Sequence, residues 1–304
     1  MPAAAGNDDD PDAPFWKALA VGAAAVFLLA AMGALIKHLA TVYPPQQLSF
    51  FRNFFGVIPN LFVLATSRDW HESGRPLRMK QWRLGISRGL MVVGAQFCFY
   101  LSLVHLELAT ASVLVFTTPL FVTALSVPLL GDRVGAWRWS AVCVGFVGVL
   151  LVMRPGSEVF SPYAFLPLGA GFAYACTAVS VRLITGNISS ATINLYSLVG
   201  SISGAFVLMM ATSGYTPVAS AQDWLLIVSM AMIGGTGVFF LVVAYRMTRP
   251  SNLAPFEYLG IVYAFLFGWL FFAEAPVERM FPGVLLIIAA GLLIIWRERR
   301  RTSV

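Results

Sequence analysis

Long apolar runs, separated by short polar breaks, follow one another along almost the whole chain. A helix needs about 20 mainly apolar residues to cross the hydrocarbon core of a bilayer, and these runs have that length. The pattern predicts an all-α membrane protein with ten transmembrane helices. Their expected ranges are about 15–37, 46–66, 82–104, 108–130, 136–153, 161–183, 190–212, 224–245, 251–272 and 279–297.

Composition supports this interpretation, because 59% of the residues are hydrophobic and 11% are charged. In globular proteins roughly a quarter of the residues are charged, so a large soluble domain is excluded. Only the ends are expected to be tails: a disordered acidic tail at 1–14 and a basic cytoplasmic tail at 298–304. The net charge of +6 does not indicate a nucleic-acid partner, because the basic residues fall in the breaks between spans.

The distribution of basic residues predicts the orientation of the ten spans. If the amino terminus is cytoplasmic, sixteen of the 20 lysines and arginines fall in cytoplasmic segments and three fall outside, while Arg52 lies within a span. Cytoplasmic loops of membrane proteins carry an excess of Lys and Arg. Both termini are therefore expected in the cytoplasm, and the chain is expected in a bacterial inner membrane, surrounded by membrane lipids.

The chain also resembles itself after a shift of about 145 residues. The shift places Phe27–Lys37 over Phe172–Arg182, and both segments are apolar, rich in small residues and closed by a cation. Two polar triplets are superposed by the same shift: Ser49, Arg52 and Gly56 over Asn194, Ser197 and Ser201. The halves 15–153 and 154–297 then hold five spans each, and an odd number inverts the second half in the membrane. Inverted repeats are typical of transporters that open one side of a midplane site at a time.

Several segments carry a family resemblance. They are FFRNFFG in the second span, ATASVLVFTTPLF leading to LLGDRV in the fourth, SNLAPFEYLGIVYAFLFGWLFFAE in the ninth, and the closing spans VGFVGVLLVMRPG and GVLLIIAAGLLIIWRER. Over residues 15–297 the chain resembles the EamA-type members of the drug/metabolite transporter superfamily. That family usually has Gly-Glu at the end of the fourth and ninth spans, where this chain has Gly131-Asp132 and Ala273-Glu274. The resemblance implies a secondary transporter rather than an enzyme, and similar proteins carry amino acids, S-adenosylmethionine or vitamins.

Arg52 lies about six residues into its expected span, where a charge facing lipid would cost several kcal/mol. It should therefore face the protein interior or a cavity. Ser49, Arg52, Gly56 and Asn60 follow one another at helical spacing and form a small or polar stripe. Arg52 is either a contact for a substrate carboxylate or phosphate, or a structural arginine that snorkels or binds carbonyl groups at the outer gate.

Glu257 is the one carboxylate well inside an expected span, and it follows Pro255, which lacks a backbone donor. An intramembrane carboxyl suits a proton carrier or a contact for a substrate amine. The alternative is a hydrogen-bonded structural glutamate that pins a bent helix. Arg52 and Glu257 have different expected depths, so they could contact opposite ends of a zwitterion.

Further polar or aromatic side chains within the spans complete the expected substrate site, and some glycines and prolines are candidate hinges. The additional substrate-binding candidates are Ser49, Gln96, Tyr100, Thr117, Tyr174, Asn194 and Tyr258. The hinge candidates are Pro119, Gly234, Gly235 and Pro255. Each also has a simpler interpretation, because polar groups join membrane helices and membrane glycines commonly serve close packing.

The sequence contains no phosphate-binding glycine loop, no metal-like histidine spacing and no catalytic set. We therefore expect no cofactor, no metal ion and no catalytic residue. The prediction is a monomer or weak homodimer that moves a small polar or amphiphilic metabolite by alternating access, with Glu257 as the candidate for proton coupling. Amino-acid export is the leading substrate hypothesis. The alternatives are uptake or exchange of S-adenosylmethionine or a riboflavin-like vitamin and, from another class, a lipid-handling protein or membrane enzyme.

Overall fold

In the computed structural model, helices and short connections make up the residues that the structure describes. These are residues 13–65, 71, 79–131, 135–154, 161–184, 190–212, 215–247, 257–274 and 280–302. Six helices within these ranges are long and apolar enough to cross a membrane, and two shorter apolar helices accompany them, Trp139–Met153 and Leu259–Phe272. The described chain is thus an all-helical integral membrane protein. The acidic residues of the expected amino-terminal tail, Asp132 and Pro255 lie outside the described ranges.

The first half of the chain forms α1 (Ala13–Leu39), α2 (Pro45–Phe55), α3 (Val57–Ala65), α5 (Trp82–His105), α6 (Leu108–Val115), α7 (Thr118–Leu130) and α8 (Ala136–Met153). The second half forms α9 (Phe165–Ser180), α10 (Ser190–Thr212), α11 (Ala221–Met247), α13 (Leu259–Phe272) and α15 (Gly283–Thr302). Short 3₁₀ turns, Pro162–Ala164 and Val181–Leu183, flank α9. α15 continues to Thr302, into the segment that was expected to be a basic tail.

Two of the expected spans are broken helices, and a proline explains each break. α2 ends at Phe55, four residues before Pro59, and α6 ends at Val115, four residues before Pro119. A proline ring clashes with the carbonyl of the residue four positions earlier and removes one helical hydrogen bond. The breaks therefore lie at Gly56 and at 116–117.

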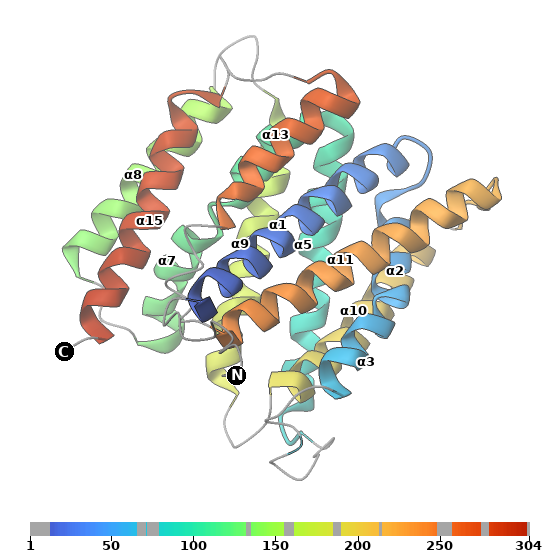
Figure 1. Cartoon of the computed structure of the whole chain (residues 1–304), viewed down its shortest axis with the longest axis horizontal. Helices are drawn as coiled ribbons and strands as arrows, with labels where there is room; N and C mark the ends of the chain where they lie inside the picture. Colours follow the sequence, from blue (N-terminus) through green and yellow to red (C-terminus); the bar gives the residue numbers. More distant parts are fainter. Residues whose placement is uncertain are drawn as a thin grey trace, which may run out of the picture.

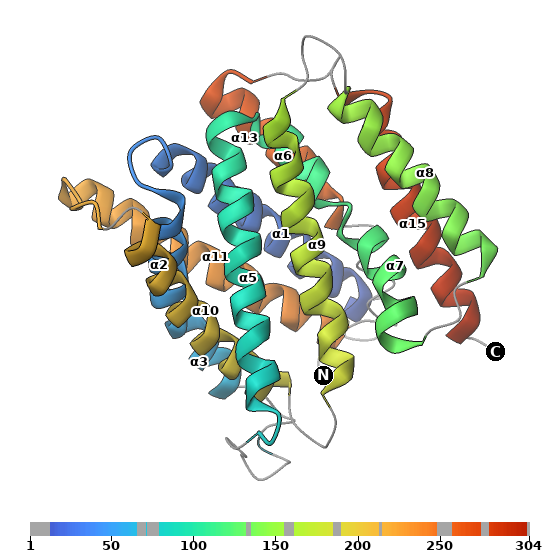
Figure 2. The ribbon, with the colours of Figure 1, turned by 180° about the vertical axis from the view of Figure 1, so that it is seen from behind.

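The helices form a bundle in which distant parts of the sequence pack together (Figure 1). α1 packs against α11, α5 packs against both α9 and α10, and α8 packs against α15. The α8–α15 pair lies along one side of the bundle, as Figure 1 and the reverse view in Figure 2 both show. The first turn of α1 and the last turn of α15 lie toward the same end of the bundle (Figure 1).

α5 and α10 cross with their backbones in contact. Gly89 on α5 faces the backbone of α10, and a Cβ at this position would overlap the carbonyl oxygen of Ser197. Gly200 on α10 faces the carbonyl group of Ile86 in the same way. Small residues at a helix interface permit such an approach in membrane proteins. The crossing holds α10 beside α5 and also close to α2, where a polar cavity lies.

Candidate substrate cavity

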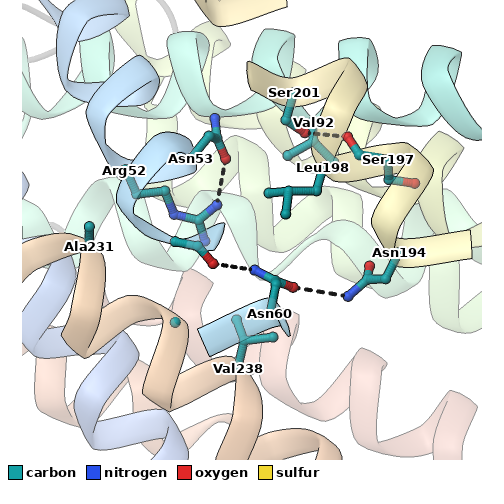
Figure 3. Close-up of a pocket in the computed structure, with 12 residues that line it drawn as sticks. Arg52, Asn53, Asn60, Val92, Asn194, Ser197, Leu198, Ser201, Ala231 and Val238 are labelled. Atoms are coloured by element: carbon teal, nitrogen blue, oxygen red, sulfur yellow. Dashed lines mark hydrogen bonds between the residues drawn. The ribbon is translucent and has the colours of Figure 1, made fainter. Parts of the chain in front are cut away.

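A cavity of about 130 Å³ lies between α2, α3, α5, α10 and α11 (Figure 3). Its polar lining residues are Arg52, Asn53, Asn60, Asn194, Ser197 and Ser201. The remaining lining residues are Gly56, Val92, Leu198, Ala231, Gly235 and Val238. The described lining thus combines one cation with amide and hydroxyl groups on an apolar wall, which is the usual character of a small-molecule site.

Helical periodicity explains how the polar residues meet. Arg52, Gly56 and Asn60 share one face that continues from α2 through the break into α3. Asn194, Ser197 and Ser201 share one face of α10. The two faces approach where Asn194 Nδ2 donates a hydrogen bond to Asn60 Oδ1 at 3.4 Å (Figure 3). They include most of the two polar triplets that the internal shift of the sequence superposes. Ser49 is the exception, because it lies behind the cavity.

Arg52 brings a positive charge to this cavity. Its Nη1 donates a hydrogen bond to Asn53 Oδ1 at 3.2 Å. Among the residues that the structure describes, no carboxylate forms an ion pair with Arg52. A guanidinium has five N–H donors, so several of them remain for a ligand.

A buried hydrogen-bond network lies directly behind Arg52. Asn53 Nδ2 donates to Gln96 Oε1 at 2.8 Å and to the Ser49 carbonyl oxygen at 2.9 Å. Ser49 Oγ donates to the same Gln96 Oε1 at 2.7 Å. Ser49 is 0% exposed and Gln96 is 1% exposed. The structure therefore places both of these substrate-binding candidates in a supporting layer rather than in the cavity wall.

The other aromatic and hydroxyl candidates do not line this cavity. Tyr100 and Thr117 are buried. Thr117 Oγ1 donates a hydrogen bond to the Leu114 carbonyl oxygen at 2.6 Å, which gives this backbone group a partner at the α6–α7 break. Tyr174 is partly exposed on α9. Tyr258 is buried against Phe116, and its hydroxyl group has no hydrogen-bond partner among the described residues.

Glu257 and the hinge candidates have separate surroundings. Glu257 is partly exposed, comes just before α13, and is not a lining residue of the cavity. α11 runs unbroken through Gly234 and Gly235, and a Cβ on Gly235 would overlap the ring of Pro59. Pro119 lies in the first turn of α7, just after a real break in the helix. The structure thus shows close packing at Gly235 and a break in the helix before Pro119.

Two residues at the site were missed by the sequence analysis. Asn53 was passed over in favour of Arg52, although both lie in the FFRNFFG segment. Arg88 is one of the sixteen cations that the charge distribution places in cytoplasmic segments, but it lies two turns into α5 and is 7% exposed. The spacing of Arg88, Val92 and Gln96 by four residues could have indicated that Arg88 shares the buried face of α5.

Arg88 joins three helices behind the cavity. Its Nη1 donates to the Thr177 carbonyl oxygen at 2.6 Å and to Ser180 Oγ at 3.2 Å, both on α9. Its Nε donates to Ser197 Oγ on α10 at 3.4 Å. Ser197 lines the cavity, so a second positive charge lies one hydrogen bond away from the cavity wall.

Comparisons with known proteins show which proteins the chain is similar to. The model of the EamA-like transporter family matches residues 16–154 and 161–296. A pseudopaline exporter of Pseudomonas aeruginosa is 27% identical over 89% of this chain and 93% of its own length. An S-adenosylmethionine uptake transporter of Rickettsia felis is 28% identical over 88% of both chains, and a riboflavin transporter of Rhizobium johnstonii is 30% identical over 63% of both. A solved crystal structure with 20% identity covers 94% of this chain and 99% of its own, with a TM-score of 0.61, which reflects a similar fold.

Proposed function

Because the chain belongs to the EamA-like transporter family, and is a membrane transporter of small molecules rather than an enzyme, we propose that it is a secondary active exporter of amino acids or closely related metabolites. The observation that carries the proposal is the guanidinium of Arg52 in a polar cavity within the bundle, where no carboxylate of the described residues forms an ion pair with it. An intramembrane cation that lines a cavity is expected to meet the substrate. In this proposal Arg52 binds the substrate carboxylate, and alternating access moves the substrate across the membrane.

The proposed architecture is ten transmembrane helices in two inverted halves, 15–153 and 154–297. Two observations support it. The family model matches the chain in two segments that nearly coincide with these halves. The packing of α1 on α11 also has a counterpart in the packing of α9 on α5, as two related halves would require. The start of α1 and the end of α15 lie toward the same end of the bundle, which supports two termini on one side, and the charge bias favours the cytoplasmic side.

Proton coupling through Glu257 remains part of the proposal. The support is chemical: Glu257 is a carboxyl group within an expected span, and it stands apart from the cavity that holds Arg52. A proton carrier and a substrate contact would then be separate residues. Pro119 and the α6–α7 break beside it form the proposed hinge with the clearest local basis.

The names of the relatives favour two further substrates. S-adenosylmethionine and riboflavin are the substrates named for transporters that are 28% and 30% identical to this chain. Exchange or uptake of such a compound is therefore the second candidate function.

Counterflow in proteoliposomes tests the proposal. Vesicles containing the full-length protein are loaded separately with unlabelled glutamate, lysine, S-adenosylmethionine or riboflavin, and entry of the same labelled compound is followed with and without a pH gradient. Specific counterflow of an amino acid supports the proposal. Counterflow of S-adenosylmethionine or riboflavin alone replaces amino-acid export with the second candidate.

A further inference from the structure

The structure assigns Asn53 the role of a positioning and specificity-determining residue. Its Oδ1 accepts the hydrogen bond from Arg52 Nη1, and its side chain is 3% exposed. We infer that Asn53 holds the guanidinium at the cavity with an uncharged partner, so that the full positive charge is left for an anionic group of the substrate. The inference rests on the proposed function, in which Arg52 contacts the substrate.

The network behind Asn53 determines which way its amide points. Asn53 Nδ2 donates to two acceptors, Gln96 Oε1 and the Ser49 carbonyl oxygen. If the amide were turned over, its oxygen would face these two acceptors and its NH₂ group would face the Arg52 donors. The hydrogen bonds to Gln96 Oε1, to the Ser49 carbonyl oxygen and from Arg52 would then be lost, and leaving buried polar groups without partners is costly. The Asn53 oxygen is therefore held toward Arg52.

Gln96 is held in turn by its own partners. Its Oε1 accepts hydrogen bonds from both Asn53 and Ser49, and its Nε2 donates to Asn53 Oδ1 at 3.3 Å. The chain of contacts thus runs from α5 through Asn53 to the charge in the cavity. Gln96 and Ser49 act on the substrate only through Asn53 and Arg52.

The choice of an amide at position 53 has an electrostatic consequence. A carboxylate in the same place would form a charge-assisted pair with Arg52, and such pairs are strong where water is scarce. A substrate anion would then have to compete with it. No described lining residue of the cavity is a carboxylate, so the site favours an anionic group over an amine. Specificity for the anionic end of the substrate therefore depends on the neutrality of Asn53.

Asn53→Asp tests this role because it changes the charge at nearly constant size. Full-length protein in proteoliposomes is treated with phenylglyoxal, which modifies accessible guanidinium groups, and modification of Arg52 is measured by peptide mass spectrometry relative to Arg154. We expect Arg52 to be modified several-fold more slowly in Asn53→Asp. Gln96→Glu keeps both accepted hydrogen bonds and places its charge behind Asn53, so its effect should be smaller. Ser203→Ala is the control and should match the wild type, because it removes an exposed hydroxyl group whose hydrogen bond, among the described residues, is to the Val199 carbonyl oxygen within α10.

A transport measurement completes the test. In Asn53→Asp, we expect the KM for counterflow of glutamate to rise at least several-fold at neutral pH, and to fall back as the introduced carboxyl group is protonated at acidic pH. A merely structural role would not give this recovery. Unchanged modification of Arg52 in Asn53→Asp overturns the positioning role, and an unchanged KM for glutamate overturns the specificity role. If modification slows as expected but the wild type carries no compound of the panel, the positioning role stands and the proposed function fails.

Discussion

Arg52 is the residue on which the proposed chemistry depends. Arg52→Ala removes the cavity's cation and leaves its amides and hydroxyls in place. We expect weaker transport of anionic and zwitterionic compounds, by about one to two orders of magnitude in kcat/KM, because a charge-assisted hydrogen bond contributes about 1.5–3 kcal/mol. Purely cationic compounds should be affected much less. Counterflow of glutamate and of lysine amide in parallel measures the difference.

A matched variant separates charge from packing. Arg52→Lys keeps the positive charge but lacks the planar fork that binds a carboxylate with two hydrogen bonds. It should retain part of the preference for anions. Equal losses for both compounds in Arg52→Ala and Arg52→Lys would indicate a structural arginine.

Glu257 carries the proposed coupling. Glu257→Gln keeps the size and the hydrogen-bonding capacity of the side chain but cannot gain or lose a proton. Accumulation driven by a pH gradient should be abolished, while exchange at equilibrium should continue at a rate near that of the wild type. Proteoliposomes with and without an imposed gradient provide both measurements. An undiminished response to the gradient would remove Glu257 from the coupling mechanism.

At the residue scale, the sequence predicted which residues share a helical face better than it predicted what each side chain contacts. The spacing of Arg52, Gly56 and Asn60 indicated a shared face, and all three residues line the cavity. Ser49 lies on the same stripe, yet it bonds Gln96 inside the protein. A hydroxyl or amide is equally suited to a ligand and to a neighbouring helix, so its residue type alone cannot decide between them. The decision comes from the packing of α2 against α5, which local sequence does not specify.

At the scale of the elements, helix breaks near prolines are easier to predict from the sequence than the burial of a charged side chain. Pro59 and Pro119 each act on the carbonyl four residues earlier, so both helix breaks have a local cause. For Arg88 the local spacing indicates only the helical face on which it lies, not the partners that allow its burial. It is buried because α9 and α10 supply oxygen atoms from about 90 and 110 residues away in the sequence.

Arg88 also gives a prediction on stability. Arg88→Met removes the hydrogen bonds to α9 and α10, but it also removes the cost of burying a charge, and the two effects largely offset each other. Arg88→Lys keeps that cost, and one ammonium group replaces the wide fork that reaches both helices. We therefore expect Arg88→Lys to lose about 1.5–3 kcal/mol of stability and Arg88→Met to lose less. Thermal unfolding in detergent should rank Arg88→Lys below Arg88→Met, and the reverse order would contradict this account.

At the scale of the whole molecule, polar contacts join the helices at one end of the bundle and the cavity lies toward the other. Lys37, at the end of α1, forms an ion pair with Glu274 and donates a hydrogen bond to the Leu106 carbonyl oxygen at 2.7 Å. Glu274 Oε2 also accepts the backbone N–H of Leu108 at 2.8 Å. The start of α5 crosses the start of α10, so the exposed Asn194 of the cavity lies at the opposite end of α5 from Leu106.

The proposed alternating access requires the end held by Lys37 and Glu274 to open in another state. Glu274→Gln removes the charge and weakens the contacts among α1, α13 and the connection before α6, so the open state should gain population. Each 1.4 kcal/mol by which the closed state is destabilised relative to the open state raises the open population about tenfold.

Ala109 is 1% exposed beside these contacts, so a cysteine introduced by Ala109→Cys is a sensitive reporter of opening. Labelling of this cysteine by a membrane-impermeant maleimide should be about tenfold faster with Glu274→Gln than without it. Thr212→Ala removes an exposed hydroxyl group whose hydrogen bond, among the described residues, is to the Leu208 carbonyl oxygen within α10, so it should leave the rate unchanged. Equal rates in all three proteins would mean that these contacts do not close the transporter.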